Sequence, residues 1–121
     1  MPKTILIVDD FESSRNILGR TLEYAGYTVL HGSDGENAMV QLNGTRIDLI
    51  ITDLNMPGMD GISLIKSLRK TINYKFTPVI LLSTNAKSDK QEQAKQAGAT
   101  AFVEKPFQVE ALLESVKKMI R

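Results

Sequence analysis

Side chains that could hold a cation and an oxyanion follow four apolar runs of this sequence. Asp9 and Asp10 follow the first run, Asp53 the second, Ser83 the third and Lys105 the fourth. If the runs are parallel strands of one open sheet, their carboxyl ends share the edge where α/β sheets bind ligands. Three carboxylates, a hydroxyl and an ammonium group would then face one pocket. Such a pocket suits a hard metal ion together with an anionic oxygen group.

Taken singly, each motif has a plain structural interpretation. Asp9–Asp10 fits a solvated turn that caps the next helix. Lys105 fits a surface lysine ahead of a proline that starts the last helix. The loop over residues 53–61 is more informative. It contains three apolar side chains, Leu54, Met56 and Met59, which a solvent-exposed connecting loop does not require. The coincidence of all these motifs at strand ends favours one shared functional site.

Two periodicities alternate along the chain and predict five strand–helix units. Residues 4–9 and 47–52 are nearly continuous aliphatic runs, which is typical of central parallel strands, while residues 27–31 suggest a partly exposed edge strand. The helical stripes contain Ile17, Leu18, Thr21, Leu22 and Ala25; Ala38 and Leu42; Ile62, Ile65 and Leu68; Ala94 and Ala97; and Val109, Leu112, Leu113, Val116 and Ile120. This alternation predicts an α/β fold with a doubly wound, five-stranded parallel sheet and five helices.

Capping residues predict where these helices begin and end. Ser13 or Ser14 is the predicted N-cap of the first helix, and Asp34 caps the second. The other predicted boundaries are Gly26, Asn43–Gly44, Gly61, Ser88–Asp89 and Gly98. The fourth helix has only two small apolar residues, Ala94 and Ala97, so we expect it to be weakly anchored and able to move.

The clustered acids have a specific chemical consequence. Three carboxylates within a few ångströms repel one another, and their pKa values rise unless a cation joins them. Mg²⁺ takes oxygen ligands and keeps waters that a phosphate can replace. Asp53, in the middle, could then attack phosphorus and form an acyl phosphate. Lys105 and the hydroxyl of Ser83 could stabilise the oxygens of the transferring group.

Composition narrows the class of protein. Fifteen basic and fourteen acidic residues among 121 give a net charge of +1, so no global field favours nucleic acid or an anionic membrane. The absence of cysteine excludes disulfides and fits the cytoplasm. No apolar stretch approaches the roughly 20 residues of a membrane helix. We expect a single domain over residues 1–121, without an effector domain. The one histidine, His31, is predicted at the surface.

In combination, these motifs resemble the receiver domains of two-component response regulators, over essentially the whole chain. The resemblance is carried by the run Ile5–Asp10, by Asp53 with Met56–Gly61, by Ser83 and by Lys105–Phe107. The fold that it implies is the flavodoxin-like (CheY-like) sheet of order 2-1-3-4-5. The activity that it implies is phosphorylation on an aspartate, with the protein catalysing no more than its own phosphorylation and dephosphorylation.

The resemblance also implies a role for each site residue. Asp53 is the implied phosphoacceptor. Asp10 and Asp53 would bind Mg²⁺ directly, together with the backbone carbonyl of Asn55, and Asp9 would act through water. The remaining implied roles are a switch hydroxyl at Ser83, a switch aromatic at Phe102, and a phosphate-binding lysine at Lys105 with a cis Lys105–Pro106 bond.

Within the family, the chain is most similar to single-domain chemotaxis regulators of the CheY type, on the run Thr52–Gly61 and on Phe76–Pro78. This similarity implies a stand-alone, monomeric switch that receives its phosphoryl group from a sensor histidine kinase. The implied target is a flagellar motor-switch protein, and neither nucleic acid nor a membrane is an expected partner. The implied output face comprises the fourth helix, the fifth strand and the fifth helix.

Three other classes of protein share parts of this pattern. A shuttle receiver in a phosphorelay would use the same chemistry. A haloacid-dehalogenase-like phosphohydrolase also uses an aspartate nucleophile and Mg²⁺, but it usually needs a second acid two residues later, where this chain has Asn55. A flavodoxin-like electron carrier would need a Ser/Thr-rich phosphate loop after the first strand. The acids Asp9 and Asp10 stand there instead and would repel a flavin phosphate.

Overall fold

The computed structural model describes residues 2–84 and 89–120, and within them five parallel strands form one sheet in the order β2-β1-β3-β4-β5. The strands are β1 (Thr4–Val8), β2 (Thr28–Gly32), β3 (Leu49–Asp53), β4 (Val79–Ser83) and β5 (Ala101–Glu104). The predicted topology is therefore confirmed. The third strand begins two residues later than the apolar run suggests. Asp48 precedes it, and its carboxylate accepts a hydrogen bond of 2.8 Å from the backbone N–H of Thr4.

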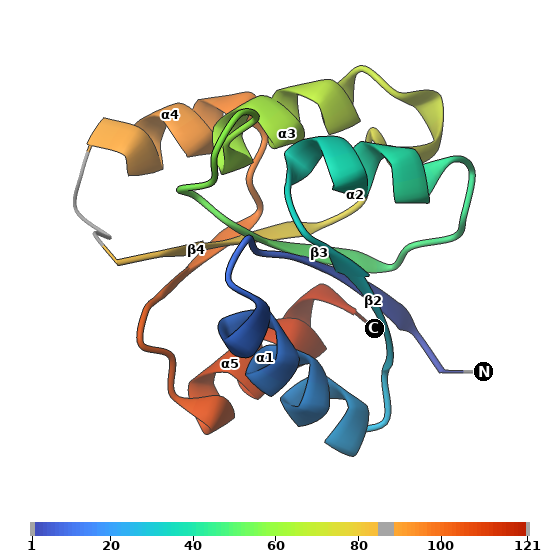
Figure 1. The fold of residues 1–121 in the computed structure, drawn as a ribbon, viewed down its shortest axis with the longest axis vertical. Coiled ribbons are helices and arrows are strands. Elements are labelled where there is room, and N and C mark those ends of the chain that lie inside the picture. Colours follow the sequence, from blue (N-terminus) through green and yellow to red (C-terminus); the bar gives the residue numbers. More distant parts are fainter. Residues whose placement is uncertain (1, 85–88, 121) are drawn as a thin grey trace.

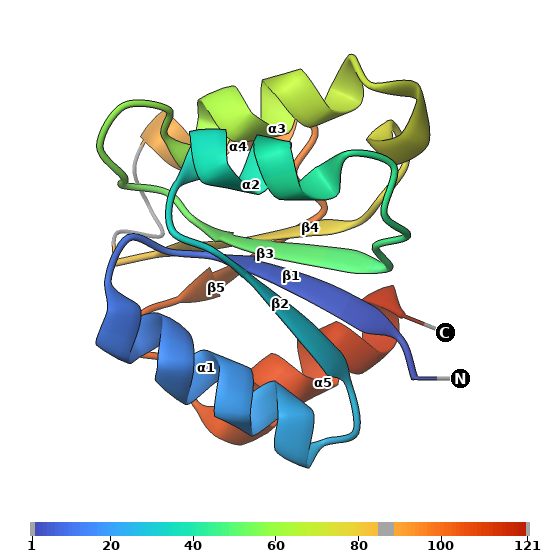
Figure 2. The same ribbon diagram turned by 45° about the vertical axis from the view of Figure 1, so that its right-hand side comes forward.

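Helices cover both faces of this sheet. They are α1 (Glu12–Tyr24), α2 (Gly35–Leu42), α3 (Gly61–Arg69), α4 (Asp89–Ala97) and α5 (Val109–Met119), with a short 3₁₀ helix, η1 (Ile72–Tyr74), after α3. Figures 1 and 2 show α2, α3 and α4 on one face and α1 with α5 on the other. Alternate residues of each strand point to opposite faces. Leu6 of β1 accordingly packs in one core and Ile7 in the other. None of the helices described is long and apolar enough to cross a membrane.

The helix caps were predicted with mixed success. Asp34 caps α2 as expected, because its side chain accepts the Asn37 N–H at 2.8 Å. The prediction for α1 is wrong. That helix begins at Glu12 after Phe11, without a side-chain cap, so Ser13 and Ser14 lie inside its first turn. The side chain of Asp9 fixes this entry by accepting the Phe11 N–H at 3.0 Å. Ser88, the proposed cap of α4, lies outside the described residues.

Two predictions on the α1 side need correction. Ile17 was placed in the buried stripe of α1, but it is 61% exposed, and Leu18 and Leu22 are the buried pair. His31 was expected at the surface, yet it is partly buried and its Nδ1 has no hydrogen-bond partner among the described residues. The edge strand β2 is covered by α1 on this face. A Cβ at Gly19 would lie 2.8 Å from the imidazole Cε1, so the missing side chain of Gly19 makes room for the ring.

Arg69, the last residue of α3, joins the C-terminal ends of α3 and α4. Its Nη1 donates to the carbonyls of Tyr74, Lys75 and Thr77 at 3.0, 3.2 and 2.7 Å, and its Nη2 donates to the carbonyl of Gly98 at 2.7 Å. Gly98 has a φ of +116°, and a Cβ there would lie 2.8 Å from Arg69 Nε. Glycine is therefore required both for the backbone turn that ends α4 and for the close approach of Arg69.

Candidate functional site

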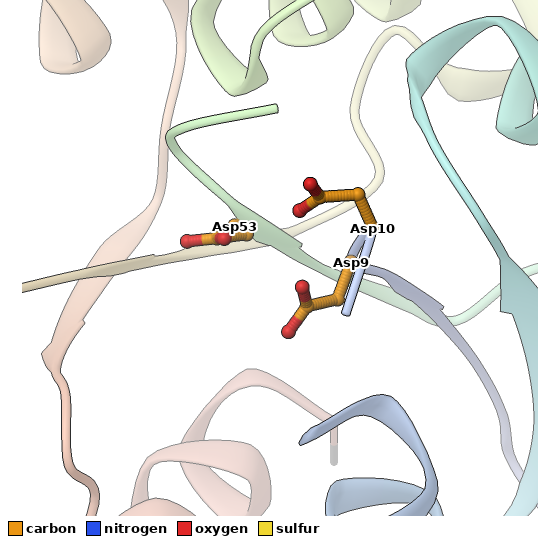
Figure 3. Close-up of side chains that lie close together, drawn as sticks. All are labelled: Asp9, Asp10 and Asp53. Carbon is orange, nitrogen blue, oxygen red and sulfur yellow. The ribbon is translucent and has the colours of Figure 1, made fainter. Parts of the chain in front are cut away.

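Three carboxylates meet at the carboxyl edge of the sheet. Asp9 and Asp10 follow β1, and Asp53 is the last residue of β3, the strand next to β1. Their side chains extend beyond the strand ends into the same space (Figure 3). One oxygen from each carboxylate lies within 4.8 Å of the other two. The structure thus brings together the three acids that the sequence pattern singled out.

Asp9 is the most enclosed of the three acids, with 1% of its surface exposed, whereas Asp10 is exposed. The backbone of Asp9 is held on both sides. Its N–H donates to the Gly32 carbonyl at 3.1 Å, and its carbonyl accepts Arg15 Nη1 at 2.6 Å. The sequence did not predict a role for Arg15, because its separation of six residues from Asp9 matches no recognisable motif. The folding of α1 back over the end of β1 brings its guanidinium to the site.

Lys105 bridges two of the acids. Its Nζ lies 3.5 Å from Asp9 Oδ2 and 3.3 Å from Asp53 Oδ2. The backbone fixes the position of the lysine, because the Lys105 N–H donates to the Ser83 carbonyl at 2.9 Å at the end of the β4–β5 pair. The peptide bond between Lys105 and Pro106 is cis, as the family resemblance implies.

The charge of Lys105 does not fully compensate the acids around it. Burial raises the pKa of Asp53 above its ordinary value, and the nearby charge of Asp9 raises it further, while the attraction and hydrogen bond of Lys105 lower it. The balance is a raised pKa, so the ionised form of Asp53 is under-stabilised. A hard cation with oxygen ligands would relieve this excess of negative charge, and the donor set therefore fits Mg²⁺.

The other predicted site residues occupy the same edge or border it. Asp53 pairs in register with Leu82, so the buried Ser83 lies one step further at the neighbouring strand end. Asn55 is exposed in the loop two residues beyond Asp53. Phe102 is partly buried and packs with the core under α2, α3 and α4. Phe102 thus borders the face that carries α4, while Ser83 borders the acids.

Two apolar side chains of the loop between β3 and α3 are packed against the core. Leu54 and Met56 are 5% and 8% exposed, which explains the apolar side chains that the sequence placed there. Gly61 makes the tightest approach, since a Cβ on it would lie 2.5 Å from the carbonyl oxygen of Asp53. The sequence identified Gly61 only as a turn former. Its larger role is to let α3 start directly against the strand that carries Asp53.

A groove of about 460 Å³ opens beside the acids on the α1–α5 side of the sheet. Asp9, Ser14 and Lys105 contribute its polar lining. Apolar side chains line the rest of the groove, among them Ile17 and Leu18 of α1 and Phe107 of the β5–α5 segment. The exposed Ile17, which the helical pattern assigned to the core, is thus part of a surface next to the candidate site.

Known proteins share this arrangement. The model of the response regulator receiver domain matches residues 5–117. The chemotaxis protein CheY of Pseudomonas aeruginosa is 39% identical over 116 residues, which cover 95% of this chain and 94% of that protein. The structure of Vibrio cholerae CheY4 superposes with a TM-score of 0.95 at 38% identity, covering 99% of this chain and all of the other.

One further solved structure bears on the metal. It is the receiver domain of the sensor histidine kinase PA1611 from Pseudomonas aeruginosa, with a magnesium ion coordinated in its active-site cleft. Its TM-score is 0.91 at 28% identity, and 98% of each chain is covered. These similarities cover nearly the whole of this chain.

Proposed function

The chain belongs to the response regulator receiver domain family of two-component signalling, and from this membership we propose that Asp53 accepts a phosphoryl group and thereby switches a protein-binding surface. The observation that carries the proposal is the place of Asp53 in the site. It lies at the end of β3, close to two other acids and 3.3 Å from the Lys105 ammonium. Phosphoryl transfer requires a nucleophile next to cationic groups that stabilise the charge on the phosphoryl oxygens.

In the proposed step, a carboxylate oxygen of Asp53 forms a bond to phosphorus. The bond from phosphorus to the donor nitrogen of a kinase histidine breaks, and that nitrogen keeps the electron pair. Lys105 would hold one phosphoryl oxygen by a charge-assisted hydrogen bond. The hydroxyl of Ser83 would hold another. Burial raises the pKa of Asp53 because it leaves the carboxylate poorly solvated, and a poorly solvated carboxylate is the stronger nucleophile.

We propose that Mg²⁺ is the ion held by this site, through Asp10, Asp53 and the carbonyl of Asn55, with Asp9 acting through water. When bound, Mg²⁺ would neutralise charge on the acids and on the phosphoryl oxygens. The exposure of Asp10 leaves room for metal-bound water, and the buried Asp9 is already held by Lys105 and by the N–H of Phe11. This division matches direct binding by Asp10 and indirect action by Asp9.

A sensor histidine kinase is the proposed donor. The groove beside Asp9 and Lys105 offers an apolar surface next to the nucleophile, including the exposed Ile17. A donor helix could rest there while its phosphohistidine approaches Asp53, since an apolar stripe on a helix seeks such a groove. A charge introduced at the exposed Ile17, as in Ile17→Glu, should slow phosphorylation by the kinase but not by a small acyl phosphate.

Intact-mass measurement tests the central claim. Incubation with acetyl phosphate and Mg²⁺ should add one phosphoryl group, and Asp53→Asn should abolish the addition. Glu110→Gln, an equivalent change on the exposed surface of α5, serves as the matched control and should be labelled normally. Lys105→Ala should still be labelled to some extent but should no longer couple phosphorylation to target binding. Persistent labelling of Asp53→Asn would rule out the assignment.

The proposed output face comprises α4, β5 and α5, with Ser83 and Phe102 as switch residues. If Ser83 moves toward the phosphate, Phe102 can occupy the space released and shift α4. Hydrogen exchange with and without beryllofluoride and Mg²⁺ tests this over residues 84–107, a range that includes 85–88 outside the described residues. Unchanged exchange throughout the range would place the output surface elsewhere.

Control of chemotaxis is the proposed pathway, with a flagellar motor-switch protein as the target. The support is the similarity to proteins named for chemotaxis in Pseudomonas aeruginosa and Vibrio cholerae. A stand-alone monomer in the cytoplasm is part of the same proposal.

A phosphorelay shuttle is the second candidate, supported by the similar receiver domain of a sensor histidine kinase. Transfer of phosphoryl from Asp53 to a histidine phosphotransfer domain would favour the shuttle, and turnover of generic phosphate esters would favour a phosphohydrolase.

A further inference from the structure

A second groove, of about 440 Å³, lies between α3 and α4, on the face of the sheet opposite α1 and α5. Three of its lining residues are basic, and the full set is Lys66, Arg69, Lys70, Gln93, Gln96 and Ala97. None of these residues belongs to the phosphorylation site. The groove therefore calls for an explanation of its own.

The positive charge of this groove is not balanced by neighbouring acids. The sequence from Gly61 to Ser83 contains four basic residues and no acidic one. Lys66 and Lys70 are both exposed, and neither forms an ion pair with any residue that the structure describes. They stand four positions apart on α3, a spacing at which like charges repel. Glu92 of α4 does not line the groove.

Arg69 shapes the groove rather than offering a free charge. Its guanidinium is already bound to four backbone carbonyls, one of them from Gly98 at the end of α4. This leaves the two lysines as the cations that a ligand can reach. On the opposite wall, the exposed carboxamides of Gln93 and Gln96 can donate and accept hydrogen bonds with a peptide backbone.

The loop after α3 adds an apolar surface to this charged one. Ile72 is 93% exposed and Phe76 is 87% exposed, in the segment whose carbonyls Arg69 binds. The ammonium of Lys75 lies 5.7 Å from the centre of the Phe76 ring. These two large apolar side chains are almost completely exposed and lie next to basic residues in the sequence. Such a combination is typical of a surface that a partner covers.

We propose that the α3–α4 groove docks an acidic segment of a partner protein. Carboxylates of the segment would lie against Lys66 and Lys70, and an apolar side chain of the same segment would cover Ile72 or Phe76. Charge complementarity identifies the occupant as acidic. The concave shape and the two carboxamides favour an extended peptide over a flat lipid surface. Both lysines lie on the firmly anchored α3, so the charged wall of the groove is in place whether or not Asp53 is phosphorylated.

Titration of the full chain with a synthetic peptide tests the proposal. The probe is a short peptide of glutamates with one leucine and one phenylalanine, and its analogue with glutamine in place of glutamate is the matched probe. In ¹⁵N–¹H spectra, amides of residues 66–70 and 93–97 should shift with the acidic peptide. Lys66→Glu/Lys70→Glu should weaken binding by about tenfold, since two attractions of modest size become repulsions.

Controls separate this site from charge in general and from the phosphorylation chemistry. Lys117→Glu/Lys118→Glu on α5 makes the same change in net charge and should leave the affinity within about twofold. Lys66→Glu/Lys70→Glu should still be phosphorylated on Asp53 by acetyl phosphate, which shows that it is folded. If the reversal prevents folding, Lys66→Gln/Lys70→Gln replaces it, with a smaller loss expected.

Three outcomes would overturn the proposal. The glutamine analogue could bind as well as the acidic peptide, or the shifts could map to α1 and α5. Vesicles containing anionic lipid could also bind more tightly than the peptide with the same dependence on Lys66 and Lys70. That last result would identify a membrane surface as the occupant. A failure of this kind would leave the role of Asp53 untouched, because acetyl phosphate labelling is measured separately.

Discussion

Helices α3 and α4 are neighbours on one face of the sheet, and the structure describes nine residues of each, yet they are anchored very differently. The buried residues of α3 are Gly61, Ile62, Leu64, Ile65 and Leu68. Among the α4 side chains that the structure describes, Ala94 alone is buried. Buried apolar area contributes roughly 25 cal/mol per Å² to stability. The apolar burial that anchors α3 is therefore much larger than that of α4.

This difference fits the roles proposed for the two helices. α3 starts against the strand that carries Asp53, because Gly61 allows contact with the Asp53 carbonyl, and it forms a fixed reference. α4 is held by the buried methyl group of Ala94, by the partly buried Ala97 and by the Arg69 link at its C-terminal end. Elements with little buried area are the ones that move in switching. The anchoring therefore supports α4 as the responsive helix and α3 as the support.

The largest expected effect on stability comes from truncating the buried side chains that anchor α3 and α4. Leu64→Ala should lower the free energy of unfolding by about 2–5 kcal/mol, since it opens a cavity in the core. Ala94→Gly should cost about 1–2 kcal/mol, from helix propensity and one lost methyl group. Urea denaturation of both variants measures the contrast. Equal losses would show that α4 is anchored as firmly as α3.

The next effect concerns the link between the helices. Arg69→Ala should cost about 2–3 kcal/mol, because partly buried carbonyls lose a charged donor. Hydrogen exchange should accelerate at the C-terminal end of α4 more than within α3. The control is Lys66→Ala on the exposed side of α3, expected within about 0.5 kcal/mol of wild type. If exchange in α4 stays at the wild-type rate, Arg69 does not anchor that helix.

A smaller effect is expected where α3 begins. Gly61→Ala should cost about 1–3 kcal/mol through overpacking, because the new Cβ would lie 2.5 Å from the Asp53 carbonyl and 2.9 Å from Leu81 Cδ1. It should also slow labelling by acetyl phosphate, since the strand end must shift. Ser63→Ala, an exposed change in the same turn, is the control. Normal stability and labelling of Gly61→Ala would show that α3 is not rooted at the site.

The smallest effect is the dependence of stability on pH. Burial raises the pKa of Asp53 above its ordinary value of 3.8. A raised folded-state pKa stabilises the protein at low pH, and this contribution is lost as the pH rises through the folded pKa. Asp53→Asn should therefore be more stable than wild type at neutral pH without Mg²⁺, and the difference should vanish in acid.

Thermal unfolding in a chelator across a pH series measures this difference. Added Mg²⁺ should narrow it at neutral pH by stabilising the ionised wild type. A less stable Asp53→Asn at neutral pH would mean that Lys105 outweighs burial and the charge of Asp9. The negative charge next to the start of α3 would then be fully compensated without a metal ion.

Much of the fold could be predicted because its signals are local. The continuous aliphatic runs predicted parallel strands buried on both faces. The strand-end residues Asp9, Asp10, Asp53, Ser83 and Lys105 predicted the sheet edge where the acids and the lysine meet. The weak anchoring of α4 could also be read from composition, since a helix with two alanines as its apolar residues cannot bury much area wherever it packs. These features depend on residue type and spacing alone.

Other features were decided by the tertiary structure. Which of Ile17 and Leu18 is buried depends on how far α1 rotates over the sheet, and the enclosure of His31 depends on the distance between α1 and β2. Arg15 reaches Asp9, and Arg69 reaches Gly98, only because distant segments meet. Periodicity fixes which residues share a face, but contacts between elements set the rotation and depth of that face, and a single sequence does not encode them in any local pattern.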